Sequence, residues 1–522
     1  MKTPKPLYWL ALTAALALAF TGCKKDDDAS RSGNLTIEKT EYTLDADEER
    51  TATVAFIAAA DWTLSVVYDD AESSADWLSV TPMSGTAGEQ TVELSATRNF
   101  RASARTAYAD IACGKQSVRL TVTQTAASDA TDFTAQFDPD FAKELQKQGI
   151  IADAGNITPE DMEKIAAITS LDVSGTEDAP GALTSLQGIE YFESLTELEC
   201  RYNQLTSLDV SRNTALMELE CQYNQLPELD VSANTKLWLL ICSSNSMETL
   251  NVGANTALTY LYCNYNELTT LDVSRNTELM YLSCFNNKLT ELDVRANTKL
   301  ADLSCSNNSL TELDVRANTE LEMFDCSNNS LTELDVSANT KLAWHFYCYG
   351  NQLTELDVSN CTALEVLFCH DNPLTSLDVS RNTALTELQC SNNQLTELDL
   401  SRNTALTKLR CFDNELTSLD LSRNTVLTDL YCGNNQLTSL DVSQNTALTE
   451  LSCFSNELPS LDLSRNTALT LLDCSYNPGD GVSSFPVTAW FDNETVPAGL
   501  DVYSSSWWYD DKTITIDFRK AE

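Results

Sequence analysis

Leucine, cysteine and asparagine recur with a period of 21 residues between Leu195 and Asn477. The unit reads L-T-x-L-x-C-x-x-N-x-L-T-x-L-D-V-S-x-N-T-x, and a single step, from Cys326 to Cys348, is 22 residues long. A period of this length is typical of a solenoid built from stacked turns of chain. The cysteines that mark the fourteen predicted units are Cys200, Cys221, Cys242, Cys263, Cys284, Cys305, Cys326, Cys348, Cys369, Cys390, Cys411, Cys432, Cys453 and Cys474.

Each unit predicts one short strand whose leucine and cysteine side chains point inward while the residues between them point outward. One unit cannot bury its apolar side alone, so the units stack with their strands parallel. The asparagines, such as Asn203 and Asn224, stand where the chain leaves the strand, and their side chains can bond to unpaired backbone groups of the turn. Short Asp-Val-Ser turns are expected on the other face.

This unit resembles the leucine-rich repeat L-x-x-L-x-L-x-x-N-x-L, with cysteine in place of the third leucine. Its second half, for example residues 208–213 (LDVSRN), is a weak copy of the first half. That doubling resembles the nested 21-residue class of bacterial repeats. The resemblance implies a curved solenoid with a sheet on its concave wall.

A different pattern, strict alternation of apolar and polar residues, fills residues 33–125 and predicts a β-sandwich. Residues 77–82 (WLSVTP), 84–85, 98–99, 105–107 and 122–124 resemble the BACON domain, an immunoglobulin-like module common in Bacteroidota surface proteins. The family name implies carbohydrate binding. Trp62 and Trp77 are either a sugar platform or core residues, and we expect core residues in a domain that serves as a spacer.

Two caps are expected at the ends of the solenoid. Residues 137–168 predict helices that start at Asp138-Pro139 and at residues 157–162, and with residues 183–189 they resemble the helical cap of internalins. After Asn477 the period stops, and residues 507–518 predict a β cap whose aromatic residues are core. The predicted fold is mainly β with a small helical cap, an immunoglobulin-like β-sandwich followed by a leucine-rich-repeat solenoid. Its expected parts are a signal peptide (1–22), a tether (23–32), a BACON-like sandwich (33–125), a helical cap with a first irregular repeat (126–194), the solenoid (195–477) and a β cap (478–522).

The first 23 residues read as a targeting segment rather than part of the fold. A positive start (Lys2, Lys5) precedes an apolar stretch that is short for a membrane span, and residues 20–23 (FTGC) resemble a lipobox that makes Cys23 the lipidated N-terminus. An ordinary signal peptide with a chance cysteine is the alternative. Residues 24–28 (KKDDD) resemble the lipoprotein export signal of Bacteroidota. The expected location is the outer membrane, lipid-anchored and facing the cell exterior.

Acidic residues dominate the charge, which is −44 at pH 7. Such a field repels phosphate backbones and anionic lipids, so nucleic acid is not an expected partner. The chain has two histidines, and its sequence contains no Cys-x-x-Cys, no His-Glu-x-x-His and no nucleophile elbow. We therefore expect no enzyme, no metal site and no cofactor.

Two features leave alternatives open. The cysteines fit free thiols in a dry core and imply a reducing or anaerobic niche, while Cys113 and Cys361 fall outside the register. A ladder of aspartates, beginning with Asp209 and Asp230, stacks like charges. Calcium could relieve that repulsion, although nearby arginines, such as Arg295 and Arg316, also offset it.

The third, fifth and seventh positions of L-x-x-L-x-C-x-x-N should face solvent on the concave sheet, and these positions vary between units. Aromatic residues cluster there, as at interfaces, although β-propensity alone also favours them on strands. The candidate ligand-binding residues are Ile241, Tyr260, Tyr262, Tyr265, Tyr281 and Phe285; His345, Tyr347, Tyr349, Phe368 and His370; and Phe412, Tyr431 and Phe454, near Lys408 and Arg410.

These observations favour a surface protein that binds a protein partner through the concave face. The two alternatives are glycan capture, with the BACON-like domain and the concave aromatics as sugar platforms, and a structural coat protein.

Overall fold

A computed structural model describes residues 35–47, 50–68, 77–127 and 132–521. The predicted signal peptide, Cys23 and the acidic tether lie outside the described residues. The chain divides into two compact units, residues 1–128 and 129–522. Over the described ranges, every helix is too short or too polar to cross a membrane.

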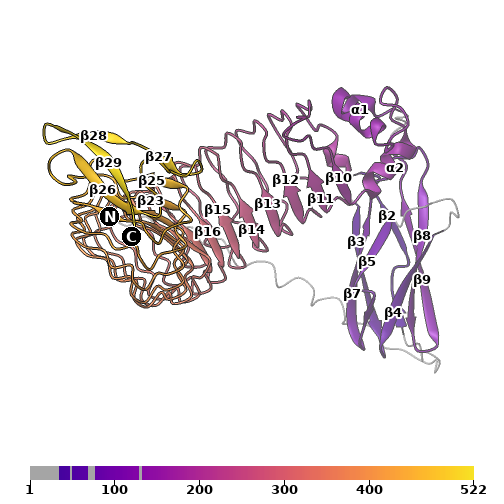
Figure 1. The fold of residues 1–522 in the computed structure, drawn as a ribbon. Coiled ribbons are helices and arrows are strands. Elements are labelled where there is room, and N and C mark those ends of the chain that lie inside the picture. Colours follow the sequence, from indigo (N-terminus) through magenta and orange to yellow (C-terminus); the bar gives the residue numbers. More distant parts are fainter. Residues whose placement is uncertain (1–34, 48–49, 69–76, 128–131, 522) are drawn as a thin grey trace, which may run out of the picture. The chain divides into compact units, whose positions relative to one another are not determined.

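The first unit is a sandwich of two sheets, as the alternation of its residues predicts (Figure 1). The sheets have the strand orders β1-β3-β7-β5 and β2-β9-β8-β4-β6, and every pairing is antiparallel except the parallel pair β2–β9. The strands are β1 (Leu35–Ile37), β2 (Glu41–Leu44), β3 (Thr51–Ala58), β4 (Trp62–Tyr68), β5 (Leu78–Thr81), β6 (Ser84–Gly85), β7 (Gly88–Ala96), β8 (Arg105–Cys113) and β9 (Gln116–Gln124).

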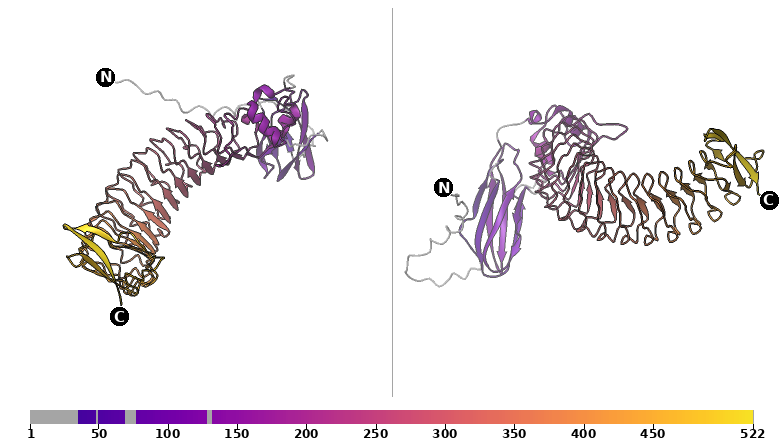
Figure 2. Two further views of the ribbon diagram at one scale, coloured as in Figure 1. Left: turned by 45° about the horizontal axis from the view of Figure 1, so that its top comes forward. Right: turned by 90° about the vertical axis from the view of Figure 1, so that its left-hand side faces the viewer.

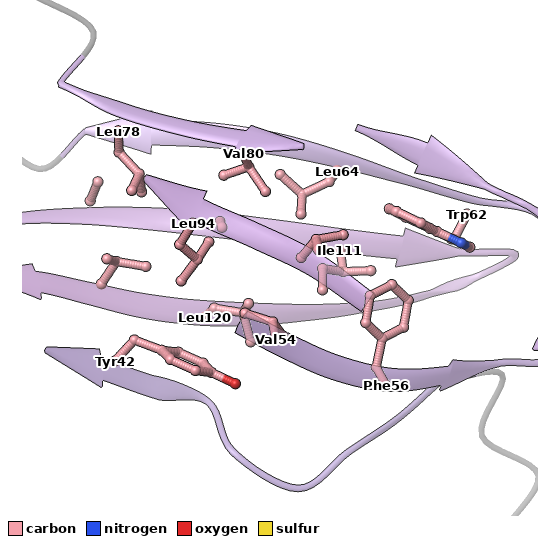
Figure 3. Packing of buried hydrophobic residues seen from close by; sticks show 14 of the residues in the cluster. Tyr42, Val54, Phe56, Trp62, Leu64, Leu78, Val80, Leu94, Ile111 and Leu120 are labelled. Atoms are coloured by element: carbon pink, nitrogen blue, oxygen red, sulfur yellow. The ribbon is translucent and has the colours of Figure 1, made fainter. Parts of the chain in front are cut away.

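Both tryptophans of this sandwich belong to its interior. Trp62 is 1% exposed and packs edge-to-face on Phe56, with ring centroids 4.9 Å apart (Figure 3). Trp77 is 2% exposed, and the Arg105 guanidinium lies 4.7 Å from the centre of its ring. Buried rings cannot stack on a sugar, so these two residues form no sugar platform.

A small helical cap starts the second unit. Helix α1 (Pro139–Lys147) begins at Asp138, whose side chain accepts two backbone N–H groups, and α2 (Pro159–Ala167) begins with a capping box between Thr158 and Asp161. The two predicted helix starts are therefore confirmed. Two 3-10 turns, η1 (Thr134–Gln136) and η2 (Ile189–Tyr191), accompany the helices, and β10 (Ser170–Asp172) follows α2.

A parallel sheet of 16 strands runs through the whole second unit (Figures 1 and 2). It begins at β10 and ends at β27 (Asp501–Val502), and each strand pairs in register with the next unit, for example Leu240 with Leu261. The fourteen strands of the repeats are β11 (Glu197–Glu199), β12 (Glu218–Glu220), β13 (Leu239–Ile241), β14 (Tyr260–Tyr262), β15 (Tyr281–Ser283), β16 (Asp302–Ser304), β17 (Met323–Asp325), β18 (His345–Tyr347), β19 (Val366–Phe368), β20 (Glu387–Gln389), β21 (Lys408–Arg410), β22 (Asp429–Tyr431), β23 (Glu450–Ser452) and β25 (Leu471–Asp473).

The interior is a stack of identical layers. The fourteen periodic cysteines are buried free thiols, as their inward register predicts. The asparagine after each strand links neighbouring units: the side-chain amide of Asn224 donates to the carbonyls of Cys200 and Cys221, both at 3.0 Å, and its oxygen accepts from the Leu205 N–H. Such bonds satisfy backbone groups that the turns leave unpaired.

A second asparagine ladder, which the sequence analysis did not identify, crosses the other half of each unit. The fully buried Asn234 donates to the carbonyls of Val210 at 3.0 Å and Asn213 at 2.8 Å. Cys361 occupies the same place in its unit, with Sγ 3.7 Å from the carbonyl oxygen of Asn339. Cys361, which is out of register with the cysteine ladder, is therefore in register with this asparagine ladder.

The far end is closed by a four-stranded sheet of order β24-β26-β29-β28. Its strands are β24 (Leu461–Asp462), β26 (Ser484–Ala489), β28 (Ser506–Tyr509) and β29 (Lys512–Lys520). Trp507 is buried and donates its indole N–H to the Asn477 carbonyl at 2.9 Å, whereas Trp508 is 64% exposed. The prediction that the cap's aromatics are core is wrong for Trp508, because successive residues of a strand point to opposite faces.

Candidate functional site

The exposed side of the 16-stranded sheet, called the sheet face below, carries the predicted ligand-binding residues. All fourteen side chains are at least partly exposed. Tyr265 and His345 are exposed, and the other twelve are partly buried. The strand register places the third-position residues in one row and the fifth-position residues in a parallel row. Residues that are far apart in sequence therefore meet as neighbours across strands.

The first aromatic cluster consists of Tyr260, Tyr262, Tyr265, Tyr281 and Phe285. The rings of Tyr260 and Tyr281 stack with centroids 4.7 Å apart, and Tyr265 meets Phe285 edge-on at 5.1 Å. Ile241 pairs with Tyr262 across β13 and β14 and extends the cluster. Burial raises the pKa of Tyr262, which therefore stays a neutral hydroxyl at physiological pH.

Tyr265 stands at a position with unusual backbone geometry. The residue before each ladder asparagine has positive φ, and Tyr265 has φ 54°. Most units fill this position with asparagine, aspartate or serine, and left-handed backbone suits a short polar side chain better than a ring. The exposed ring at 265 is therefore not explained by local backbone preference.

The second aromatic cluster consists of His345, Tyr347, Tyr349, Phe368 and His370. Tyr347 stacks on Phe368 at 4.6 Å and on His345 at 5.6 Å, while Tyr349 stacks on His370 at 4.4 Å. An edge contact between Phe368 and His370, 6.2 Å apart, joins the two stacks. Burial lowers the pKa of His370, so its ring is neutral at pH 7.

The third predicted group divides into separate environments. Arg410 lies 5.2 Å from the centre of the Tyr431 ring, and the Tyr431 hydroxyl donates to Glu450. Burial, followed by that hydrogen bond, raises the pKa of Tyr431 to about 12. Phe454 covers Gly433, where a Cβ atom would come within 2.3 Å of the ring. Among the described residues no ring contact joins any two of Phe412, Tyr431 and Phe454, so this group lacks the ring pairs that both of the other groups contain.

A row of exposed apolar side chains, which the sequence analysis missed, borders the sheet face. The residue just before the third position, called the flank position below, is threonine in many units, and its hydroxyl donates to the preceding unit, as Thr428 does to the Thr407 carbonyl at 3.0 Å. The threonines that donate in this way are Thr196, Thr386, Thr407, Thr428, Thr449 and Thr470.

Four units carry a large apolar residue at the flank position instead. Met217 is 42% exposed, Trp238 36%, Met280 38% and Trp344 53%. Trp238 also contacts Tyr260, with ring centroids 5.7 Å apart, and so continues the first aromatic cluster. The departure from threonine is visible in the sequence and could have marked these residues.

Asp302 lies between the two aromatic clusters in the third-position row. It pairs with Tyr281 on one side and Met323 on the other, and Ser283 and Ser304 occupy the adjacent fifth-position sites. Its side chain is half-buried, and within the described ranges its carboxylate has no hydrogen-bond or ion-pair partner. Burial raises the pKa of Asp302, and nearby Asp325 adds to that effect.

The opposite face holds the aspartate ladder in a groove of about 1470 Å³. One carboxylate oxygen of each ladder aspartate accepts a backbone N–H two residues on, as Asp335 does from Ser337 at 2.9 Å. Arg316 adds a bidentate contact to Asp314, and side-chain and backbone hydrogen bonds lower the pKa of that carboxyl to about 2. Across the described part of the chain, no three histidine, cysteine or acidic side chains are arranged to hold a metal ion.

The two units of the chain are similar to different known proteins. The family model described as the viral BACON domain matches residues 34–127. The functional domain of InlJ from Listeria monocytogenes, a structure that includes a cysteine ladder, is 31% identical, with a TM-score of 0.57 over 74% of this chain and 98% of that one. The chain belongs to the internalin family of leucine-rich-repeat proteins. In this internalin, a BACON domain precedes the repeats.

Two further solved structures are similar to the repeats to a lesser degree. A TDR receptor is 20% identical, with a TM-score of 0.53 over 67% of this chain and 70% of that one. The internalin InlF from Listeria monocytogenes is 21% identical, with a TM-score of 0.48 over 74% of this chain and 99% of that one. No curated protein matches this internalin in sequence.

Proposed function

We propose that this internalin is a binding protein without enzymatic activity, and that it recognises a protein partner through the sheet face between β12 and β19. The observation that carries the proposal is the pair of aromatic clusters, whose rings contact one another across strands yet remain partly exposed. Exposed apolar patches of contiguous residues mark interaction sites, and aromatic residues dominate the energetics of protein interfaces.

The flank position supports the same surface. A threonine there gains a hydrogen bond to the preceding unit, whereas Met280 and Trp344 leave an apolar side chain in water. Folding alone favours the threonine, because the hydroxyl finds a partner and no apolar area stays exposed. Met280 and Trp344 occur in units of the aromatic clusters, and Trp238 contacts Tyr260 of the next unit, so a partner that covers the clusters also covers these three residues.

A glycan is the alternative ligand. Stacked tyrosines such as Tyr260 and Tyr281 present a flat apolar surface of the kind a sugar ring packs on. In the BACON domain, however, the buried Trp62 and Trp77 cannot serve as a platform. The exposed apolar side chains of Trp238, Met280 and Trp344 beside the rings favour a protein over a sugar, because a sugar has little apolar area with which to cover them.

We further propose that the protein is a lipoprotein held at the outer face of the outer membrane through acylated Cys23. Support comes from the apolar stretch and the small residues before Cys23, and from the acidic run that follows it. The strong negative charge of the chain gives no attraction to anionic lipid, so acyl chains supply the anchoring.

The test of the binding function is selection of a random-peptide phage library on the immobilised full chain, with a glycan array in parallel. Serine occupies the fifth position at 283, 304 and 452, so the fold accepts the changes Tyr262→Ser and Tyr347→Ser. We expect the selected peptides to lose at least tenfold in affinity for the double variant. Tyr476→Ser, at an exposed tyrosine of the last unit, serves as the control and should leave the affinity unchanged.

Two results contradict the proposal. One is a set of selected peptides whose affinity is the same for the double variant and for the parent chain. The other is strong binding to the glycan array that the double variant abolishes, which would assign the same face to a sugar.

A further inference from the structure

We infer that the partner presents one lysine or arginine side chain, flanked by apolar residues, and that its cation pairs with Asp302 between the two aromatic clusters. This inference rests on the proposed function and adds the chemistry of the contact. It depends on where the strand register places Asp302, on what surrounds its carboxylate, and on how the nearby cations of the chain are already used.

The register makes Asp302 the midpoint of a row of five side chains. Tyr260, Tyr281, Asp302, Met323 and His345 are successive partners on β14 to β18. Adjacent strands lie about 4.8 Å apart, so each neighbour is within reach of a side chain that rests on Asp302. Asp302 has Tyr281 on one side and Met323 on the other, and the ring of Tyr260 stacks on Tyr281.

The side chains beside this row are small or already engaged. Ser283 and Ser304 occupy the fifth position next to Tyr281 and Asp302, where β14 has Tyr262 and β18 has Tyr347. Asp325, on the next strand, accepts the N–H of Ser327 at 3.0 Å and its hydroxyl at 2.6 Å. Asp302 has neither contact, so its carboxylate remains available in the third-position row, as does the exposed carboxylate of Glu322 at the flank position beside Met323.

Within the described ranges no lysine pairs with Asp302, and the lysines of the surrounding units are paired elsewhere. The Lys299 ammonium lies 2.6 Å from Glu278 and the Lys341 ammonium 2.5 Å from Glu320, while Lys288 pairs with Glu267. His345 is the one basic group whose charge is felt at Asp302, and it belongs to the aromatic cluster. A half-buried carboxylate without a cation gains most from a partner that brings one.

The surroundings favour a basic side chain over a metal ion. A divalent cation needs several oxygen ligands, and no group of three potential ligand side chains exists in the described residues. Lysine and arginine combine a cation with an apolar stem. The stem can pack on Tyr281 and Met323 while the cation meets Asp302, and tyrosine rings attract a cation held near their faces.

Two synthetic heptapeptides test this inference on the full chain. One has a central lysine among leucines, and its twin has norleucine in place of the lysine, which keeps the stem and removes the charge. Isothermal titration at 0.15 M salt should show the lysine peptide binding at least tenfold more tightly than its twin. Asp302→Asn should reduce that preference to less than twofold, whereas Asp429→Asn, at the same third position on β22, should leave it unchanged.

Three outcomes overturn the inference: equal affinity for the twins, a lysine preference that survives Asp302→Asn, or binding of neither peptide. In the first two cases, a loss of affinity in the Tyr262→Ser, Tyr347→Ser variant shows that the proposed function stands while the inference fails. If that variant has no effect on either the peptides or the selected library, both fail. An oligomer of glucosamine, run as a third probe, would overturn the inference if it alone bound in an Asp302-dependent way.

Discussion

The side-chain amide of Asn318 donates a hydrogen bond to the backbone carbonyl of Asn297, one unit earlier, at 2.9 Å. Both asparagines are fully buried, and Asn318 also donates to the Val294 carbonyl at 2.9 Å. The same pair of bonds recurs along the solenoid, so each unit is tied to the one before it on the side away from the cysteine ladder. Order in the stack therefore depends on two asparagine ladders rather than on apolar packing alone.

Replacing Asn318 with alanine should lower the free energy of unfolding by about 1–3 kcal/mol. The change removes two buried hydrogen bonds worth about 0.5–1.5 kcal/mol each, while the Val294 and Asn297 carbonyls keep the backbone N–H groups of Asn297 and Leu300 as donors. Urea denaturation of the full chain measures the loss. Thr319→Ala, at the exposed neighbour, is the control and should change stability by less than about 0.5 kcal/mol. Equal stability of the two variants would show that the ladder bonds are not needed.

The cysteine ladder predicts a loss of stability at high pH. Burial raises the pKa of Cys221 and Cys284 from 9.0 to about 12, because the interior disfavours the thiolate. A thiol with a raised folded-state pKa contributes stability that is fully present below pH 9 and is lost as the pH rises toward 12. Each such thiol adds a slope of about 1.4 kcal/mol per pH unit in that window.

Urea denaturation under reducing conditions at pH 7, 8, 9 and 10 measures this slope. Between pH 7 and 8 the free energy of unfolding should barely respond to the thiols, and above pH 9 it should fall steeply. Cys284→Ala removes one titrating group, so this variant should show a shallower fall than the parent chain, whatever its stability at pH 7. Rapid alkylation of the ladder thiols in the native chain at pH 8 is the result that would contradict their burial.

The repeats were predictable because their signal is redundant. Fourteen copies of one pattern fix the strand, the inward leucine and cysteine and the first asparagine ladder, and the structure confirms the fold class that this pattern predicts. The helix starts at Asp138 and Thr158 could be predicted equally well, because an N-cap residue followed by proline favours a helix start through local interactions alone. Properties set within a few neighbouring residues are visible in one sequence.

Contacts between units were harder to predict. The aromatic residues 412, 431 and 454 are close in the repeat pattern, but the structure separates them, since Arg410 and Glu450 engage Tyr431 while Phe454 covers Gly433. The apolar flank and the place of Cys361 were missed because both are departures from a consensus. The role of each of these residues depends on its contacts with the neighbouring unit of the stack.

Replacing Cys23 with alanine should release the protein from the membrane. Acyl chains on that residue are the proposed anchor, and burial of acyl CH₂ groups contributes about 0.8 kcal/mol each. Metabolic labelling with palmitate and detergent phase partition measure the effect: the parent chain should label and enter the detergent phase, and the variant should do neither. Cys113→Ala, at a buried thiol of the BACON domain, is the control and should behave as the parent does. Labelling that persists in Cys23→Ala would refute the anchor.

The flank position separates a requirement of binding from a requirement of folding. Met280→Thr restores the residue that folding favours, because the new hydroxyl can donate to the Thr259 carbonyl as Thr428 does to Thr407. We expect the free energy of unfolding to stay within about 1 kcal/mol of the parent value or to rise. Affinity for the selected peptides should fall about threefold to tenfold, since an exposed apolar contact is lost.

The reverse change gives the matched control. Thr428→Met places the same side chain at the flank position of a unit outside the aromatic clusters, so it should lower stability by about 1 kcal/mol through the lost hydrogen bond and leave peptide affinity unchanged. If Met280→Thr instead destabilises the protein and binds peptides normally, the flank methionine serves packing within the solenoid. Because the two substitutions exchange the same pair of residues, a change of peptide affinity in Met280→Thr alone can arise only from where that unit stands along the sheet face.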